Sequence, residues 1–305
     1  MRLYRKKPAL LLILIFAALG GYEAVRWYRA RPLPPAAQLK RLPQRDAVLI
    51  YIDFRRLRAG IPGLIDSSKV AEDPDYREFA RKIDLDWKRD LDSVMLAIAP
   101  SGKFMIVEGR FDWNSLRAYA QGAGGECYGP ACRVNGSTAE RRISFLPLGD
   151  RVMALAVSSD EWAVRSLQGE APGPPDAALP DAPMWIKIPG AVLKSETGLP
   201  EGTRMFARSI QEADYALLTL APDGQRLAAK LDVHCNDAHD AADIAGELSH
   251  ATALLREMIA REHQTPNPAD FSGVLSSGSF WSQGNRVYGT WPIERAFVEN
   301  LLGGA

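Results

Sequence analysis

The stretch Asp92-Ser-Val-Met-Leu-Ala-Ile-Ala-Pro-Ser-Gly102 returns later in the chain as Asp214-Tyr-Ala-Leu-Leu-Thr-Leu-Ala-Pro-Asp-Gly224. Five of the eleven aligned positions are identical. In both copies an apolar run ends in Ala-Pro-x-Gly and a second apolar run follows. Because proline pre-sets a turn backbone and glycine tolerates conformations that crowd other side chains, each copy predicts a β-hairpin.

The similarity extends to both sides of these hairpins. Asp46-Ala47 opens an apolar run and returns as Asp181-Ala182, 135 residues later, and the segment 144–152 matches 279–287 at the same offset, with five of nine positions identical. The hairpins themselves are 122 residues apart, so one copy carries 13 extra residues before its hairpin and the other carries 13 after it. Three matches in the same order predict a tandem duplication.

The duplication predicts two α+β repeats, at residues 46–170 and 183–305, joined by a Pro-rich linker at 171–182. In each repeat we expect an opening strand, a hairpin, a helix, a second hairpin and a closing helix, which gives mostly antiparallel sheets with packed helices. Ser158 or Ser159 suits the start of the first closing helix, and Pro292 suits the first turn of the second. The expected strands are 48–53, 94–99, 104–111, 143–147, 152–157, 184–188, 216–221, 227–233, 271–281 and 287–290, with helices at 113–120 and 238–262.

The N-terminus has the layout of a membrane signal-anchor. Residues 1–7 are basic, and the run 9–22 is apolar and carries no charge. This run is shorter than the ~20 residues of a full span, but its apolar and aromatic flanks extend it to a predicted transmembrane helix at 8–28. Alternatives are a signal cleaved near Gly20 and a buried soluble helix. A Pro-rich tether is expected at 29–45.

This layout predicts a single-pass protein of the inner membrane of the cell envelope. The N-terminus would be cytoplasmic, and the bulk of the chain would be periplasmic or extracellular. Lysine plus arginine and aspartate plus glutamate both total 37, so no net charge directs the chain to nucleic acid.

Three cysteines are too few for a disulfide-built fold. Outside the cytoplasm, Cys127 and Cys132 can close a small loop around Gly129-Pro130 by a disulfide. Free thiols are the alternative, and redox or metal chemistry would need a different spacing or a second pair. Cys235 is left unpaired, and we expect it to be buried.

The densest group of possible metal ligands is His234-Cys-Asn-Asp-Ala-His-Asp-Ala-Ala-Asp243. His239 and Asp243 are four residues apart on a predicted helix and could share a metal ion. The same residues also fit an ordinary helix start, where caps and negative charge are favourable. This second interpretation is preferred, so no metal site is predicted. The carboxylate-rich segment 84–92 lacks the glycine and glutamate of a calcium-binding EF-hand loop.

Asp46-Ala-Val-Leu-Ile-Tyr-Ile-Asp53, Gly109-Arg-Phe-Asp-Trp113 and the segment from Cys132 to Phe145 resemble a family of bacterial single-pass envelope proteins that has no assigned activity. The resemblance covers mainly the first half. It implies a membrane-anchored topology and no site residues.

The sequence contains no Gly-x-Ser-x-Gly nucleophile motif and predicts neither a catalytic residue nor a cofactor. The expected function is therefore non-catalytic: an extracytoplasmic binding or scaffold module with an envelope protein partner. The alternatives are an envelope hydrolase with a site between the two halves and a metal-binding module around His239 and Asp243.

Overall fold

The computed structural model describes residues 32–63, 65, 74–136, 138, 141–170, 179–194, 206–224 and 226–303. The predicted membrane helix at 8–28 lies outside this part of the chain. Among the residues described, no helix is long and apolar enough to cross a membrane.

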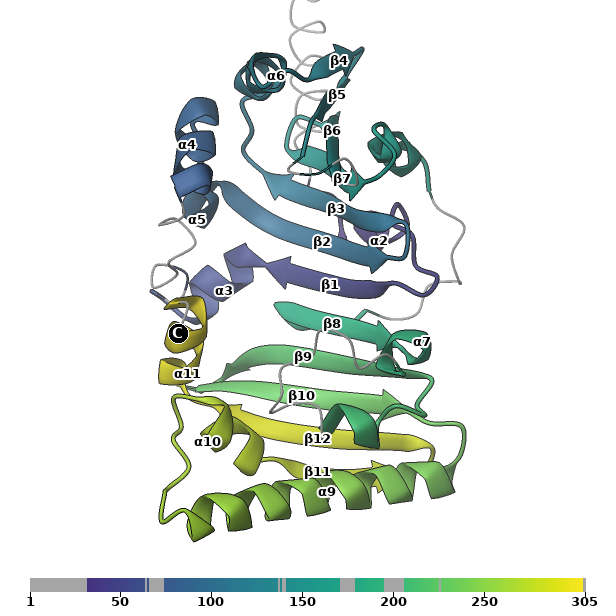
Figure 1. The fold of residues 1–305 in the computed structure, drawn as a ribbon, viewed down its shortest axis with the longest axis vertical. Helices are drawn as coiled ribbons and strands as arrows, with labels where there is room; N and C mark the ends of the chain where they lie inside the picture. The colour runs from purple at the N-terminus through teal and green to yellow at the C-terminus, as the bar shows by residue number, and fades with distance from the viewer. Residues whose placement is uncertain are drawn as a thin grey trace, which may run out of the picture.

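The described strands form one antiparallel sheet of 12 strands, around which the helices pack (Figure 1). Its order is β11-β12-β10-β9-β8-β1-β2-β3-β7-β6-β5-β4. The strands are β1 (Val48–Asp53), β2 (Leu91–Ala99), β3 (Gly102–Gly109), β4 (Glu126–Tyr128), β5 (Ala131–Val134), β6 (Arg142–Gly149), β7 (Val152–Ser158), β8 (Met184–Pro189), β9 (Tyr215–Asp223), β10 (Arg226–His234), β11 (Ser279–Gln283) and β12 (Arg286–Ile293).

The helices occupy both faces of this sheet. They are α2 (Pro35–Leu39), α3 (Phe54–Gly60), α4 (Pro74–Ile83), α5 (Trp87–Asp90), α6 (Trp113–Gly122), the 3-10 helix η2 (Ala163–Gln168), α7 (Gly190–Leu193), α9 (Ala238–Arg261), α10 (Phe271–Ser276) and α11 (Arg295–Gly303). The α+β class with a mostly antiparallel sheet is thus as predicted.

Strands β1 and β8 pair where the two halves of the chain join, and residues 60–62 also lie against the second half. Leu49 lies opposite Lys187, and Tyr51 lies opposite Trp185. Outward from this seam the order is β1-β2-β3-β7-β6 on one side and β8-β9-β10-β12-β11 on the other, and the β4–β5 hairpin is added beyond β6. The strands of both halves therefore join one continuous sheet.

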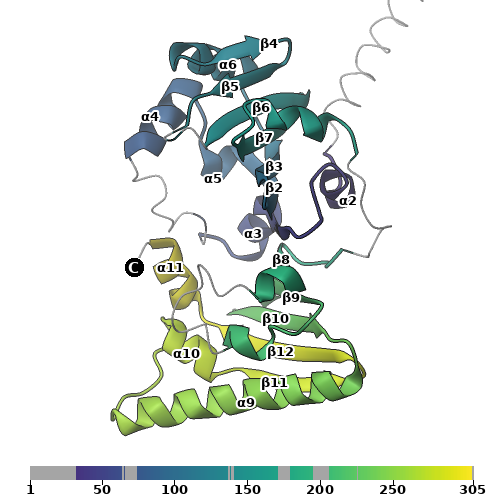
Figure 2. The same ribbon diagram turned by 45° about the vertical axis from the view of Figure 1, so that its right-hand side comes forward.

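The main cores of the two halves lie on opposite faces of the sheet. In the second half, Ile188 and the strands β9–β12 pack against α9, α10 and α11. In the first half, Tyr51 and Trp185 belong to a core that includes Leu42 after α2 and Leu167 of η2. Trp185 and Ile188 point to opposite faces because side chains alternate along a strand. Helices α4 and α6 cover the other face of the first half through a smaller core around Phe145 (Figure 2).

Several predicted elements differ from the observed ones. Residues 271–276 form α10 and not the start of a strand, because Asp270 caps a helix there by accepting hydrogen bonds from the Ser272 and Gly273 N–H groups. Pro292 belongs to β12, past the last residue that pairs with β11, where a missing N–H costs no ladder bond. The first half closes with the 3-10 helix η2, which begins after Trp162 and not at Ser158 or Ser159.

The two hairpins that share the Ala-Pro-x-Gly signature turn at different residues. In the first, Ala99 pairs with Gly102, and a Cβ on Gly102 would lie 2.6 Å from the Val157 carbonyl oxygen. In the second, Asp223 pairs with Arg226, so the proline stays in the strand and Gly224 takes a positive φ of 61°. Both glycines have a positive φ, which is 142° at Gly102, and in the first copy the close approach of the neighbouring strand also requires glycine.

The small β4–β5 hairpin is closed by a disulfide between Cys127 and Cys132. These residues lie directly opposite each other in the ladder. Reduction is expected to lower the free energy of unfolding by about 2 kcal/mol, the loop-closure entropy of so short a loop. Thermal unfolding with and without dithiothreitol measures this. An unchanged melting temperature would show that the bridge contributes nothing to stability.

Candidate functional site

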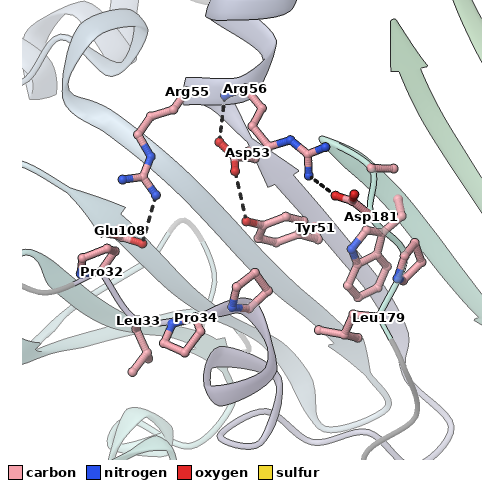
Figure 3. A pocket seen from close by; sticks show the side chains of 14 residues that line it. Pro32, Leu33, Pro34, Tyr51, Asp53, Arg55, Arg56, Glu108, Leu179 and Asp181 are labelled. Carbon is pink, nitrogen blue, oxygen red and sulfur yellow. Dashed lines mark hydrogen bonds and ion pairs between the residues drawn. The ribbon is translucent and has the colours of Figure 1, made fainter.

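A pocket of about 420 Å³ lies at the seam between the two halves (Figure 3). Two connecting segments form its walls: residues 32–35, which follow the predicted membrane anchor, and residues 179–182, which end the linker between the halves. Its floor comes from β1 and β8, and further lining residues come from β3 and the start of α3. The pocket therefore lies where the described ends of two connecting segments meet the paired strands of the two halves.

Two aromatic side chains make the floor. Tyr51 of β1 and Trp185 of β8 are cross-strand neighbours, with ring centroids 5.8 Å apart. Both are buried. The strand register alone places them together, because directly opposed residues of an antiparallel pair project on the same face.

A buried glutamate, Glu108 of β3, lines the pocket beside this floor. Its side chain is only 2% exposed. The Ser93 hydroxyl donates to Glu108 Oε2 at 3.3 Å, and the Gln38 amide donates to the Ser93 hydroxyl oxygen at 3.2 Å. Gln38 lies in α2 and also donates to the Leu33 carbonyl at 2.8 Å. A buried polar chain thus ties the segment that follows the predicted anchor to the sheet, although residues 29–45 were expected to be a stiff spacer.

The charge of Glu108 is poorly compensated. Burial raises the pKa of Glu108, and the Arg55 guanidinium, 3.9 Å away, opposes that rise. Glu108 Oε1 is buried and has no hydrogen-bond partner, and the same holds for Gln38 Oε1. Unpaired buried acceptors are costly, so each calls for an explanation such as a bound donor.

Tyr51 and Asp53 form the second polar pair of the pocket. The Tyr51 hydroxyl donates to Asp53 Oδ2 at 3.5 Å, and Asp53 Oδ1 caps α3 by accepting from the Arg56 N–H at 2.9 Å. Burial, followed by the charges of Asp53 and Glu108, raises the pKa of Tyr51 to about 12. The phenol therefore stays protonated at physiological pH and acts as a donor.

Two arginines stand at the mouth. Arg56 pairs with Asp181 of the linker at 2.9 Å, and both side chains are exposed. Arg55 is also about half exposed, and its ion pair within the described part of the chain is the 3.9 Å contact to Glu108. Its N–H donors are thus directed toward the pocket and the solvent, as Figure 3 shows.

Four arginines hold the carboxylates where α5 ends and β2 begins. Asp92 sits in a β-bulge and pairs with Arg151 and, at 3.7 Å, with Arg58 of α3. Asp90 pairs with Arg110 and Arg89. Asp86 thus caps α5, and Asp90 and Asp92 are ion-paired. The negative charge of Asp92 also contributes to the raised pKa of Glu108.

The residues that the sequence singled out lie elsewhere. His239 and Asp243 are 3.4 Å apart on the exposed side of α9 and do not line the seam pocket. Over the described ranges, no group of three or more His, Cys, Asp or Glu residues comes together that could hold a metal ion. Cys235 is buried, which raises the pKa of its thiol.

Asp237 caps α9 by accepting hydrogen bonds from the His239 and Asp240 N–H groups, as the helix-start interpretation requires. Asp237→Ala is expected to lower the free energy of unfolding by about 1 kcal/mol, the usual value of a lost cap. Denaturant unfolding measures it. Added zinc should leave wild-type stability unchanged, and a zinc-dependent gain that His239→Ala abolishes would contradict the cap interpretation.

The sequence reasoning did not identify Tyr51, Asp53, Arg55 or Glu108. A local signal existed for one of them: Glu108 is the single acid inside the apolar run Phe104-Met-Ile-Val-Glu-Gly109. Nothing local joins Glu108 to Tyr51, because β1 and β3 are not adjacent in the sheet and meet the pocket only through the tertiary fold.

No family model and no curated protein matches the chain. Solved structures of TP0453 do: its crystal form I aligns with a TM-score of 0.50 at 12% identity, covering 87% of this chain and 98% of that one. Crystal form III gives a TM-score of 0.49 at 10% identity, with 88% and 98% covered. At this identity the likeness to form I supports the fold alone, a large antiparallel sheet with packed helices.

Proposed function

We propose that the protein is a single-pass protein of the cell envelope whose extracytoplasmic α+β domain is a non-catalytic binding module, with its binding site in the seam pocket. The observation that carries this proposal is the construction of the pocket. The segment that follows the predicted anchor, the linker and the strands β1 and β8 all converge on it. Any occupant would thus contact both halves and the membrane-proximal segment at once.

Three features support the anchored, extracytoplasmic placement. The basic N-terminus and apolar run have the order of a signal-anchor. The Cys127–Cys132 disulfide suits an oxidising compartment. Pro32 already lines the seam pocket, four residues after the predicted span ends, which is a contour length of at most about 14 Å. The pocket would therefore lie close to the membrane surface.

We further propose that the two halves arose by tandem duplication. The strand order, identical on either side of the β1–β8 seam, supports it, as do the three sequence matches. In this view the pocket lies where the two copies join.

An envelope hydrolase is the second candidate, and the convergence of Asp53, Glu108 and Tyr51 in one pocket favours it. A catalytic acid must come within hydrogen-bond reach of substrate, but Asp53 is engaged as a helix cap and Glu108 Oε2 already accepts from the Ser93 hydroxyl. Among the described lining residues there is no Ser, Thr, Cys or His to act as a nucleophile or base. These features favour binding over catalysis. The third alternative, a metal module at His239 and Asp243, has an exposed pair with no third ligand in the described ranges.

Site-specific photocrosslinking of the full-length protein in its native membrane tests the proposal. A crosslinking residue at Pro34, on the exposed rim of the pocket, should capture one discrete envelope component. The matched control, at exposed Arg261 of α9, should not. Equal capture at both positions, or none at Pro34, would count against a binding module at the seam.

Fractionation of the same cells should place the protein in the membrane; recovery from the cytoplasm would refute the envelope placement.

A further inference from the structure

We infer that the seam pocket is a binding site for a zwitterionic group, whose ammonium donates to Glu108 Oε1 while its anionic group pairs with Arg55 at the mouth. This inference specifies the ligand of the binding function proposed above.

Glu108 offers a ligand an unpaired hydrogen-bond acceptor. Glu108 lines the pocket, its side chain is 2% exposed, and its Oε1 atom has no donor, although Oε2 receives the Ser93 hydroxyl. A buried carboxylate oxygen is stabilised most by a donor that carries positive charge. Arg55 approaches Oε2 and only to 3.9 Å, which is beyond hydrogen-bond distance. The unsatisfied acceptor Glu108 Oε1 therefore favours a ligand that carries an N–H donor, and an ammonium group fits best.

The rest of the pocket lining combines charged groups with apolar walls. Three carboxylates (Asp53, Glu108 and Asp181) and two guanidiniums (Arg55 and Arg56) line the pocket, so it offers partners to both charges of a zwitterion. The Tyr51 and Trp185 rings and the prolines of the two connecting segments provide apolar walls. Ring faces add attraction for a cation held near them.

The mouth of the pocket holds two arginines. Arg56 is engaged by Asp181 at 2.9 Å, whereas Arg55 is about half exposed and, among the residues described, comes no closer to an acid than the 3.9 Å to Glu108. An anionic group next to the ligand's ammonium would find the Arg55 guanidinium there, in the fork geometry that suits carboxylate and phosphate. A simple amine would leave this donor unused. An ammonium joined to an anion satisfies both ends of the pocket.

Two sources share this chemistry: the head group of an ethanolamine phospholipid and a free amino acid. Isothermal titration calorimetry on the full-length protein in a nonionic detergent separates them, with glycerophosphoethanolamine and alanine as probes. Whichever binds more tightly identifies the source. Glycerophosphocholine is the chemical control, because its trimethylated nitrogen has no N–H to donate. We expect it to bind at least about tenfold more weakly, the value of a hydrogen bond to a charged group.

Glu108→Gln should weaken binding of the preferred probe by about tenfold or more. The matched variant Glu257→Gln, on exposed α9, should leave binding unchanged. Because the ammonium stabilises ionised Glu108, binding should lower the pKa of Glu108, release a proton and tighten as pH rises. Titrations in buffers of different ionisation enthalpy measure the released proton.

Equal affinity for the choline probe, unchanged affinity in Glu108→Gln or absence of binding at millimolar probe would each overturn the inference. The choline comparison uses the wild-type protein and so does not depend on the variant folding. These outcomes are independent of the proposed function: a partner captured at Pro34 together with no probe binding would remove the zwitterion site and leave the binding module.

Discussion

Replacing Trp185 by alanine is expected to lower the free energy of unfolding by about 3 to 5 kcal/mol, the range for removing a large buried aromatic side chain. Trp185 is 2% exposed, packs against Tyr51 across the β1–β8 seam and belongs to the core of the first half although its strand comes from the second. The cavity left behind would lie where the two halves join. Equilibrium denaturation by urea gives the change directly.

Trp281→Ala is the matched control, because Trp281 is 49% exposed on β11 and its main ring contact is Tyr288. Trp281→Ala should lower the free energy of unfolding by about 1 kcal/mol or less, the value of an aromatic pair on a sheet surface. If the two substitutions lower the free energy of unfolding equally, the seam is not a region of tight packing. A second, separate transition in Trp185→Ala would show that the seam makes the two halves unfold as one unit in the wild-type protein.

Replacing Glu108 by glutamine is expected to stabilise the protein, on the order of 1 kcal/mol above neutral pH, because it removes a buried and poorly paired charge. The pKa of Glu108 is raised in the folded state, so the folded protein binds more protons than the unfolded chain. The contribution of Glu108 to stability is therefore fully present below the ordinary carboxyl pKa and is lost as pH rises through the raised value. Glutamine cannot ionise, so the variant should lack this fall.

Unfolding of both proteins between pH 4 and pH 9 checks this, and the advantage of the variant should grow with pH. A loss of stability at high pH would mean that Arg55 compensates the charge of Glu108 more fully than its distance suggests, even though Arg55 is partly screened by solvent. Greater stability together with weaker zwitterion binding would show that the buried acid is retained at a cost to the fold for the sake of binding.

Much of the secondary structure could be predicted from sequence patterns that span only a few residues. The helix at 238–262 was predicted nearly to its observed ends because Ala241, Ile244, Ala245 and Leu248 follow helical spacing and become its buried face. Asp270 shows the limit: its capping of α10 competes with the strand propensity of Phe271, and sequence alone gave no way to rank the two. The position of the second hairpin's turn had the same difficulty, because Pro222 tolerates the strand end as well as the turn.

By itself, the sequence determined the α+β class and the opening, hairpin and helix order of each half, since alternation, helical periodicity and Ala-Pro-x-Gly signatures act over a few residues. Only the tertiary structure decided that Tyr51 meets Trp185, that segment 32–45 packs into the first half and that Glu108 is buried at the seam. The register of β1 against β8 and the burial of a strand acid depend on contacts between residues far apart in the chain. The two Ala-Pro-x-Gly hairpins mark corresponding positions in two halves with the same strand order. The candidate site lies on the strand pair between these halves.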